Sequence, residues 1–486
     1  MTVNGNKMVN QDSNTDVIIL GVGTSGEDLS LQLLDAGLDV VGIEANLVGG
    51  TCPYYGCLPS KMMVRAANLL KESERVRSMS GEASTSPDWS KIAKLVRQLT
   101  GEWSDAGGVE RFEKRGGRLI HGEGKFTGPR TVSVNGKSFT ARKGVVIATG
   151  TKPVIPPISG LDKVNYWTTD DIIKAESLPE SLVIIGGGAT GSELGQVLAR
   201  YGVAVTIVEP GDRVLRLEEP EASEKVEEAF AEDGITVHKG ARAKEVESRN
   251  NLIVTRLDDG EELTSERLVI ATGRKPDLAK LGLESAGLDS SAKFIEVDER
   301  MRAAEGIWAM GDVTGKAMLT HVALYQGAII AADILGKEHP PAEFHSIPRV
   351  TFTDPEVGSV GFTETEAKEA GFDVAVVTKQ IAATFRGILH GNNSGVIKLV
   401  VDRATGNLIG ATAVGSRGGE ILGLLTLAVH ARIPITKLRS MIYAFPTFTG
   451  GIGEAIGAYG RGITTVLDPG YSGLKKLDQV VEALGS

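Results

Sequence analysis

Cysteine is scarce in this chain, and that scarcity excludes several classes of protein. Only two cysteines occur among 486 residues, at positions 52 and 57. Two thiols are too few to build a zinc or iron–sulfur site, so no metal site is expected. A disulfide-rich secreted scaffold would also need more of them. A bridge across five positions adds little stability, and the spacing alone leaves open a redox pair or two unrelated buried thiols.

Long apolar runs and an excess of positive charge are missing as well. No stretch reaches the roughly 18 apolar residues of a membrane span, and the polar residues 1–15 lack the apolar centre of a signal peptide. We therefore expect a flexible leader, a cytoplasmic protein and no membrane partner. The net charge of −10 argues against nucleic acid as a partner. The length is too great for one hydrophobic core and predicts several domains.

Glycine, in contrast, is abundant, with 61 residues, and some of it follows a phosphate-binding pattern. An apolar strand at 16–21 leads into Gly21, Gly23 and Gly26, and after a helical stretch a second strand ends at Glu44. The glycines would permit the turn, admit a pyrophosphate and let the helix pack closely, while the acid would hold ribose hydroxyls. One such match is weak, because a generic glycine-rich turn is nearly as common.

The same pattern returns 165 residues later, with Gly186, Gly188, Gly191 and a strand ending at Glu209. A chance repeat of strand, glycines, helix and terminal acid is improbable. Two such units predict two bound dinucleotides, which is the arrangement that electron transfer between them requires.

Three further strands and a change of pattern complete the organisation. The segments 144–153 and 267–276 each contain an apolar strand ending in Ala-Thr-Gly, and 306–315 places Asp312 at a strand end. These ends suit the edge of an open α/β sheet, where ligands bind. Beyond about residue 345, strand-like runs lead to helices, which indicates a separate α+β domain. A short terminal helix is predicted at 473–486.

The segment GGTCPYYGCLPSK at 49–61 adds a specific resemblance. Together with both glycine loops, both Ala-Thr-Gly strands and DPEVGSVGFTE at 354–364, it makes residues 16–465 resemble the class I pyridine nucleotide-disulfide oxidoreductases, which include dihydrolipoamide dehydrogenase, glutathione reductase and mercuric reductase. The resemblance implies an α/β fold with two Rossmann-like dinucleotide-binding domains, for FAD and NAD(P), a C-terminal α+β dimerisation domain, and a homodimer. The implied bounds are 1–15 for the leader, 16–155 and 277–345 for the two parts of the FAD-binding domain, 156–276 for the NAD(P)-binding domain, 346–467 for the dimerisation domain and 468–486 for a C-terminal tail.

The resemblance also implies the residues that hold the cofactors. Glu193 would pair with Lys61, which would lie beside the flavin and stabilise negative charge on it and on a nearby thiolate; an ordinary ion pair is the alternative. Asp312 would hold the ribityl chain, with Thr320 close to the flavin. The full cofactor-binding set is Gly21, Gly23, Gly26, Glu44, Gly50, Thr51, Lys61, Gly124, Thr149, Gly150, Gly186, Gly188, Gly191, Glu209, Gly273, Gly311, Asp312 and Thr320.

By the same resemblance the two cysteines form a redox-active disulfide. Cys57 would face the flavin, and Cys52 would attack an acceptor disulfide, after which Cys57 would resolve the mixed disulfide. Glu209 favours NADH over NADPH, because a carboxylate accepts hydrogen bonds from a free 2′-hydroxyl and repels a 2′-phosphate. Arg213 and Arg216 follow it and leave NADPH possible.

One segment departs from the family pattern. Most disulfide reductases carry His-Pro-Thr and a Glu five residues after the His, a proton-transfer pair donated by the other subunit. Here Phe445 and Gly450 stand at these positions. A phenylalanine cannot transfer protons, so ordinary dihydrolipoamide or glutathione chemistry should be impaired. Tyr443 or Glu454 could substitute as an acid, although a tyrosine in such a segment more often serves packing.

The departure leaves several acceptors open. The expected function is an FAD-dependent NAD(P)H oxidoreductase that reduces a small disulfide or thiol-type acceptor through Cys52 and Cys57. A diaphorase-like reductase of quinones or metal ions is the alternative; mercuric reductases share Phe-Pro, but they add a C-terminal cysteine pair that this chain lacks, and Thr447 replaces their tyrosine. A thiol-linked carbon–sulfur enzyme resembling ketopropyl-coenzyme M carboxylase is a further alternative, and that match is partial at Gly450.

Overall fold

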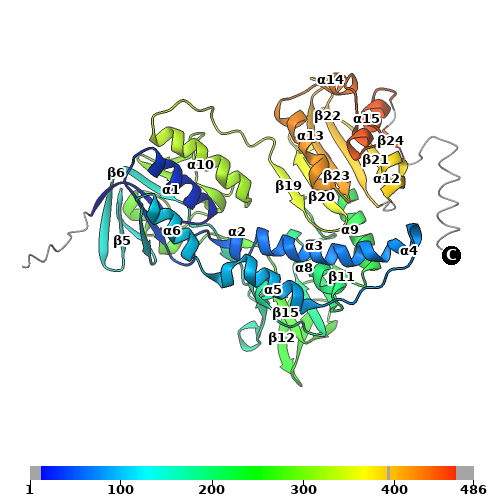
Figure 1. The fold of residues 1–486 in the computed structure, drawn as a ribbon, viewed down its shortest axis with the longest axis horizontal. Helices are drawn as coiled ribbons and strands as arrows, with labels where there is room; N and C mark the ends of the chain where they lie inside the picture. The colour runs from blue at the N-terminus through cyan, green and yellow to red at the C-terminus, as the bar shows by residue number, and fades with distance from the viewer. Residues whose placement is uncertain (1–12, 391–393, 463, 467–486) are drawn as a thin grey trace, which may run out of the picture. The chain divides into compact units, whose positions relative to one another are not determined.

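The computed structural model describes residues 13–390, 394–462 and 464–466. The chain divides into two compact units, each assembled from three separate stretches (Figure 1). The first unit comprises Met1–Leu58, Arg97–Pro153 and Arg274–Glu343. The second comprises Pro59–Val96, Val154–Gly273 and Phe344–Ser486.

A largely parallel sheet forms the centre of the first unit, with the strand order β17-β18-β6-β1-β2-β3. Strand β1 pairs in parallel with both β2 and β6, and its central residues Val17–Ile19 are fully buried, as expected for a parallel strand covered on both faces. Helix α1 packs against α10 and α6. The bounds are β1 Asn14–Leu20, α1 Thr24–Asp35, β2 Val40–Glu44, α6 Ala106–Lys114, β3 Arg118–His121, β4 Lys125–Gly128, β5 Thr131–Val134, β6 Lys137–Ile147, β17 Arg302–Ala304, β18 Ile307–Ala309 and α10 Thr320–Ile334.

The second unit contains a parallel five-stranded sheet of order β11-β10-β9-β15-β8 and an antiparallel three-stranded sheet, β12-β13-β14. The helix between β9 and β10 is α8, so strand, helix and strand repeat the β1-α1-β2 arrangement of the first unit. The bounds are β8 Trp167–Thr168, β9 Ser181–Ile185, α8 Ala189–Arg200, β10 Ala204–Glu209, α9 Pro220–Glu232, β11 Thr236–Lys239, β12 Ala243–Arg249, β13 Leu252–Leu257, β14 Glu262–Ser265 and β15 Arg267–Ile270.

A six-stranded sheet of order β19-β20-β23-β22-β21-β24 completes the second unit. Helices α13 and α15 pack on it, and apolar side chains between helices and strands, among them Leu399 and Ile452, form a separate core. The bounds are β19 Pro348–Thr351, β20 Glu356–Gly361, β21 Val374–Gln380, α12 Phe385–His390, β22 Val396–Asp402, β23 Leu408–Gly415, α13 Gly418–His430, α15 Phe448–Tyr459 and β24 Thr465–Val466.

The predicted fold class is confirmed. Both predicted strand–loop–helix–strand units form, the two Ala-Thr-Gly strands are β6 and β15, and the strand-like runs beyond residue 345 share one sheet. Strand β1 starts at Asn14, so it includes two residues of the expected leader. The rest of that leader up to residue 12, the tail at 468–486 and its predicted helix lie outside the described residues.

Candidate functional site

The two glycine loops have the same construction. Gly21 and Gly186, which follow β1 and β9, have φ angles of 97° and 115°, a region that residues with side chains rarely adopt. A Cβ at either position would lie within 2.5 Å of the carbonyl oxygen that follows the neighbouring Ala-Thr-Gly strand. A Cβ on Gly26 or Gly191 would lie 2.2 or 2.1 Å from the carbonyl oxygen of the first glycine of its own loop. Close packing therefore requires glycine at all four positions.

The middle glycines, Gly23 and Gly188, are the N-cap residues of α1 and α8, and neither helix has a side-chain cap. A Cβ on Gly188 would meet no atom within 4 Å, and one on Gly23 would meet only a backbone carbon at 3.8 Å. Each helix N-terminus therefore lacks a side-chain cap and has open space beside its capping glycine. This is the surrounding that a dinucleotide pyrophosphate requires, so the residues present fit two dinucleotides.

A buried glutamate braces each loop. In the first loop Glu44 accepts hydrogen bonds from the N–H groups of Val22 at 2.7 Å and Asn46 at 2.8 Å. In the second loop Glu209 accepts from the two N–H groups of Gly187 and Gly211, both at 2.8 Å. Burial raises the pKa of Glu44. The sequence indicated these acids only as ribose ligands; a carboxylate has further lone pairs for that role, which stays a prediction.

The predicted cysteine segment packs directly on the first glycine loop. An isolated bridge joins Gly23 to Gly49, and the Thr24 hydroxyl donates to the Gly49 carbonyl at 2.7 Å. Gly50, with a φ of 67°, then starts the short helix α2 (Thr51–Tyr54), and α3 (Cys57–Glu74) begins at the second cysteine. The backbone thus brings the candidate sulfurs to the first glycine loop.

Both cysteines are free thiols, and they lie within hydrogen-bonding reach of each other. The Cys57 Sγ lies 3.5 Å from the Thr320 Oγ1 at the start of α10. Hydrogen bonding to Cys57, followed by burial, raises the pKa of the Cys52 thiol. The Cys52 thiol therefore holds its proton more tightly than an ordinary thiol.

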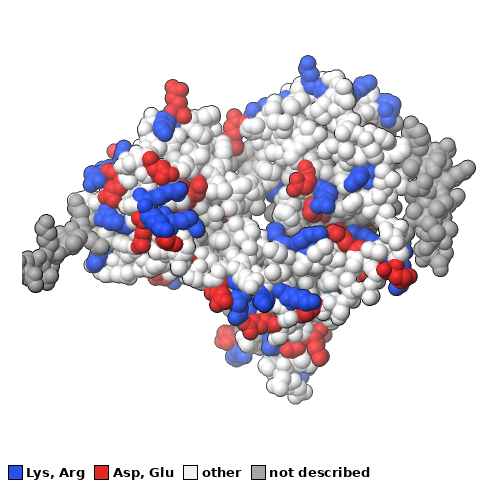
Figure 2. Space-filling view, in the orientation of Figure 1, with Lys and Arg blue, Asp and Glu red and all other residues white. Residues whose placement is uncertain are grey.

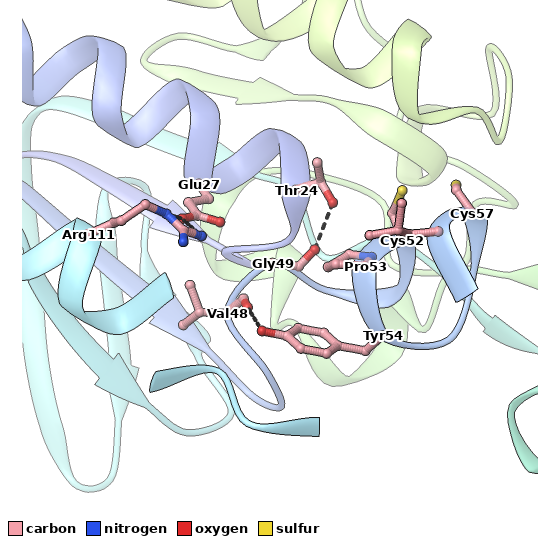
Figure 3. A pocket seen from close by; sticks show the side chains of 10 residues that line it. Thr24, Glu27, Val48, Gly49, Cys52, Pro53, Tyr54, Cys57 and Arg111 are labelled. Carbon is pink, nitrogen blue, oxygen red and sulfur yellow. Dashed lines mark hydrogen bonds and ion pairs between the residues drawn. The ribbon is translucent and has the colours of Figure 1, made fainter. Parts of the chain in front are cut away.

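A cavity of about 400 Å³ opens beside the cysteines. Figure 3 shows Cys52 and Cys57 at one side and the ion pair between Arg111 and Glu27 at the other. The guanidinium donates to one Glu27 oxygen at 2.8 and 3.0 Å. No local pattern indicates this pair, because its members are 84 residues apart. The lining is Thr24, Glu27, Val48, Gly49, Cys52, Pro53, Tyr54, Cys57, Leu58 and Arg111.

The remaining predicted residues of the first unit lie at strand ends or in tight turns. Asp312 is buried, accepts a hydrogen bond from the Thr151 hydroxyl at 2.8 Å, and has a pKa raised by that burial. Gly150 and Gly311 have φ angles of 62° and 75°. A Cβ on Gly124 would lie 2.4 Å from a leucine of β1. The predicted residues that belong to this unit are Gly21, Gly23, Gly26, Glu44, Gly50, Thr51, Cys52, Cys57, Gly124, Thr149, Gly150, Gly311, Asp312 and Thr320.

In the second unit the predicted lysine–glutamate pair is present. The Lys61 ammonium lies 2.7 Å from the Glu193 carboxylate, which is 4% exposed. The other Glu193 oxygen accepts the N–H of Phe352 at 2.8 Å, and the ammonium also lies 4.8 Å from the centre of the Phe352 ring. The pair is thus held by α8, which carries Glu193, and by the backbone that directly follows β19. Its role beside a flavin stays a prediction.

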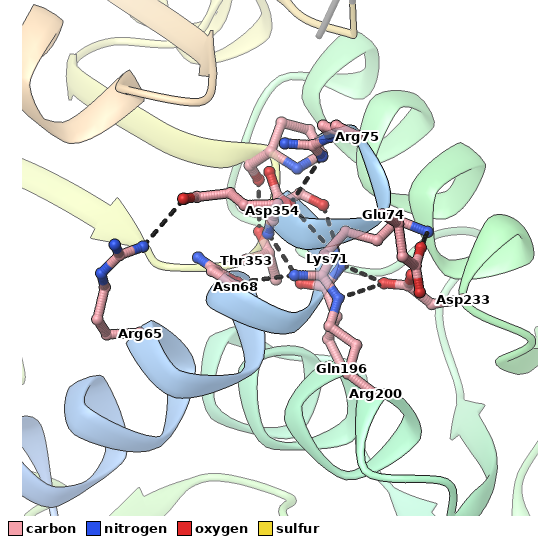
Figure 4. Close-up of polar contacts among 12 residues, drawn as sticks. Arg65, Asn68, Lys71, Glu74, Arg75, Gln196, Arg200, Asp233, Thr353 and Asp354 are labelled. Atoms are coloured by element: carbon pink, nitrogen blue, oxygen red, sulfur yellow. Dashed lines mark hydrogen bonds and ion pairs between the residues drawn. The ribbon is translucent and has the colours of Figure 1, made fainter. Parts of the chain in front are cut away.

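An ion network anchors the far end of α3 (Figure 4). Lys71 and Arg200 both bind Asp233, at 3.1 and 2.8 Å. Arg75 and Arg200 both bind Asp354, at 3.2 and 3.1 Å. The Arg200, Asp233 and Asp354 side chains are almost fully buried, so α3 is fixed to α8 and to the segment after β19.

The segment that departs from the family pattern is exposed at Phe445 and packed at Tyr443. Phe445 is 70% exposed, and its ring lies edge-on to Phe385 at 4.9 Å. The Tyr443 hydroxyl donates to the Leu438 carbonyl at 3.0 Å, and burial raises its pKa, which favours a packing role. The second unit holds Lys61, Gly186, Gly188, Gly191, Glu193, Glu209, Gly273, Tyr443 and Phe445.

Two kinds of feature are missing from the described residues. No helix in ranges 13–390, 394–462 and 464–466 is long and apolar enough to cross a membrane. Nor does this part of the chain group three or more His, Cys, Asp or Glu side chains so that they could hold a metal ion.

Comparison with known proteins yields consistent matches. The family model "Pyridine nucleotide-disulphide oxidoreductase" matches residues 15–327, and the model of the dimerisation domain matches 347–456. The chain is 33% identical over 456 residues to a mercuric reductase of Lysinibacillus sphaericus, covering 92% of this chain and 82% of the relative. It is 32% identical over 473 residues to a dihydrolipoyl dehydrogenase of Haloferax volcanii, covering 93% and 98%. Among solved structures, the Cu(II) complex of the HOCl-induced flavoprotein disulfide reductase RclA from Escherichia coli is similar, with a TM-score of 0.81, 26% identity, and coverage of 91% and 99%.

Proposed function

Because the chain belongs to the pyridine nucleotide-disulphide oxidoreductase family, we propose that it transfers electrons from NADH to a small disulfide or thiol-type acceptor through Cys52 and Cys57. Enzymes of this family use FAD and NAD(P)H. When bound, FAD would supply the two-electron chemistry that links hydride transfer from the nicotinamide to reduction of the cysteine disulfide. The observation that carries the proposal is the cysteine pair seated on the first of two matching glycine loops.

The described residues have distinct tasks in this proposal. The first glycine loop with Glu44 holds the ADP part of FAD, Asp312 holds its ribityl chain, and Lys61 with Glu193 stabilises negative charge near the flavin. The regions 16–155 and 277–345 are assigned to FAD, 156–276 to the nicotinamide cofactor and 346–467 to the dimer contact. Cys57 faces the flavin, and Cys52 meets the acceptor.

The geometry around Glu209 supports NADH as the donor. Its carboxylate stands at the end of β10, where a 2′-phosphate would meet its charge. Arg213, which could neutralise that phosphate, donates instead to the carbonyls of Arg216 and Glu218 at 3.2 and 3.3 Å. We expect kcat/KM for NADH to exceed that for NADPH.

Replacement of the interchange thiol tests the proposal. Cys52→Ser should abolish NADH-dependent reduction of bis(2-hydroxyethyl) disulfide, because no sulfur is left to attack the acceptor. The same variant should still bleach its flavin when NADH is added anaerobically. Turnover of this disulfide at the wild-type rate in Cys52→Ser would refute the route through the cysteines.

Metal ions are a second candidate class of acceptor. Phe445 stands at the position of the family's proton-transfer histidine, and the relative from Lysinibacillus sphaericus is a mercuric reductase. Reduction of Hg(II) or Cu(II) needs no protonated leaving thiol, so it would tolerate the phenylalanine. The rate of NADH oxidation with either ion is measured in the wild type and in Cys52→Ser, and is compared with the rate with disulfides. A rate with the metal ion far above that with any disulfide favours metal-ion reduction over disulfide reduction.

A further inference from the structure

The Thr320 hydroxyl lies at the cysteine pair. Its Oγ1 is 3.5 Å from the Cys57 Sγ, and either atom could be the donor. The same hydroxyl also forms a hydrogen bond with Cys52. One side chain therefore contacts both sulfurs, although 263 residues separate it from Cys57. The sequence predicts this threonine only as a neighbour of the flavin, so its contact with the sulfurs is a separate observation.

The threonine and the cysteine segment are both held against α1 of the first unit. Helix α10, which begins at Thr320, packs along α1, and its Ile330 is fully buried. The cysteine segment reaches the start of the same helix, because the N-cap residue Gly23 forms a bridge with Gly49 and the Thr24 hydroxyl donates to the Gly49 carbonyl. Packed elements therefore set the distance between the hydroxyl and the sulfurs.

A hydroxyl suits a sulfur that gains and loses a proton. A threonine carries one O–H donor and two acceptor lone pairs, so it can accept a hydrogen bond from a thiol and donate one to a thiolate. Hydrogen bonds to a charged group are roughly twice as strong as those between neutral groups. The contact therefore stabilises the thiolate more than the thiol.

The groups around Cys52 show why such a donor matters. Hydrogen bonding to Cys57, the largest effect, and burial raise the pKa of the Cys52 thiol. The hydrogen bond with Thr320 is the largest effect that lowers this pKa. Because the thiolate is the form that attacks a disulfide, a group that favours ionisation raises the reactive fraction at neutral pH.

The sulfurs also lie at the N-terminal end of α10. This helix spans 15 residues, and its N-cap residue, Leu319, offers no side-chain hydrogen bond. The positive end of a helix dipole favours a nearby thiolate. The backbone keeps this contribution when a side chain changes, so a substitution of Thr320 isolates the effect of the hydroxyl.

We propose that Thr320 is a positioning residue for the redox pair: its hydroxyl fixes the two sulfurs and donates a hydrogen bond to the thiolate that reduction of the Cys52–Cys57 disulfide creates. This inference rests on the proposed disulfide reductase function. The reduction adds two electrons, which originate from NADH, and one proton to the S–S bond, which breaks and leaves one thiol and one thiolate. Thr320 keeps its own proton throughout.

The alkylation rate of the reduced holoenzyme tests the hydroxyl without any acceptor turnover. Wild type and variants are reduced anaerobically with dithiothreitol, desalted and treated with iodoacetamide over a range of pH. We expect Thr320→Val to lower the rate at pH 7 by about tenfold, because a hydrogen bond to a charged group is worth at least roughly this factor. At high pH, where thiols ionise without help, the rate should equal that of the wild type. Thr320→Ser keeps a hydroxyl and should stay within about twofold of the wild type.

Thr131→Val is the matched control. It removes a hydroxyl of the same unit that pairs with the Thr140 hydroxyl at 3.1 Å, and it should leave the alkylation rate unchanged. If Thr320→Val does not fold, Thr320→Ala takes its place.

The pH profile distinguishes thiolate stabilisation from a merely structural role. A loss at pH 7 that disappears at high pH and is absent in Thr320→Ser supports the proposal. An unchanged profile in Thr320→Val, a loss of equal size at every pH, or the same loss in Thr320→Ser overturns it. Purification of Thr320→Val without flavin would assign the hydroxyl to the cofactor and also overturn it. Retained disulfide turnover in Cys52→Ser refutes the proposed function instead, and the alkylation result does not depend on it.

Discussion

The ion network that anchors α3 should contribute several kcal/mol to stability, and Asp354→Asn tests this. The substitution preserves the shape of the side chain but removes one of the two buried carboxylates that face Lys71, Arg75 and Arg200 (Figure 4). The Arg200 side chain is 5% exposed, so it cannot recover water as a partner. Breaking a buried ion pair by removing one member costs about 3–5 kcal/mol.

The expected effect is large enough to measure. We take about 3 kcal/mol, because Arg200 keeps its bond to Asp233 at 2.8 Å. At roughly 2 °C per kcal/mol for a large domain, Tm should fall by about 6 °C. Differential scanning calorimetry on the holoenzyme provides the measurement. Glu82→Gln, which breaks the exposed pair with Arg77, is the matched control and should shift Tm by less than about 1 °C. Equal shifts in the two variants would refute the reasoning that burial sets the cost.

Three further outcomes are expected. Gly26→Ala places a Cβ 2.2 Å from the Gly21 carbonyl oxygen and should lower the free energy of unfolding by about 1–3 kcal/mol, so the protein should purify with less flavin per chain. Gly107→Ala, where the nearest atom is 3.8 Å away, should retain its flavin. Equal flavin content in both variants would contradict the steric argument. For Glu44, whose folded-state pKa is raised by burial, the folded state binds the proton more tightly than the unfolded chain, so its contribution to stability is present at low pH and is lost as pH rises through the folded pKa. Measured as Tm against pH, Glu44→Gln should therefore gain on the wild type as pH rises above about 4, the ordinary range of a glutamate, and a constant difference would exclude this origin. Thr447→Ala removes the N-cap of α15, whose hydroxyl accepts the N–H three residues on at 3.0 Å, and should cost about 1 kcal/mol in denaturant unfolding; no change would mean that another group caps the helix.

The sequence predicted those parts of the fold that are determined by one short, continuous stretch of the chain. The strand, Gly21 turn, helix and Glu44 follow from glycine spacing and apolar periodicity, and the structure contains them at these positions. The pairing of Lys61 with Glu193 was predicted only through the family resemblance, because 132 residues separate the two.

Other features depend on packing between distant segments and leave no local signal. Arg111 meets Glu27 only because α6 packs against α1. Thr320 meets Cys57 across 263 residues only because α10 packs against α1 and brings its first residue to the cysteine segment. Composition and spacing could not reveal either contact.

The paired glutamate braces have a consequence for how the cofactors are acquired. Because Glu44 and Glu209 each accept two backbone N–H groups with buried side chains, both glycine loops keep their shape by means of the polypeptide itself. A dinucleotide that arrives has little chain entropy to suppress, so most of its contact energy appears as affinity. Protein stripped of its prosthetic group should thus accept a fresh one without refolding.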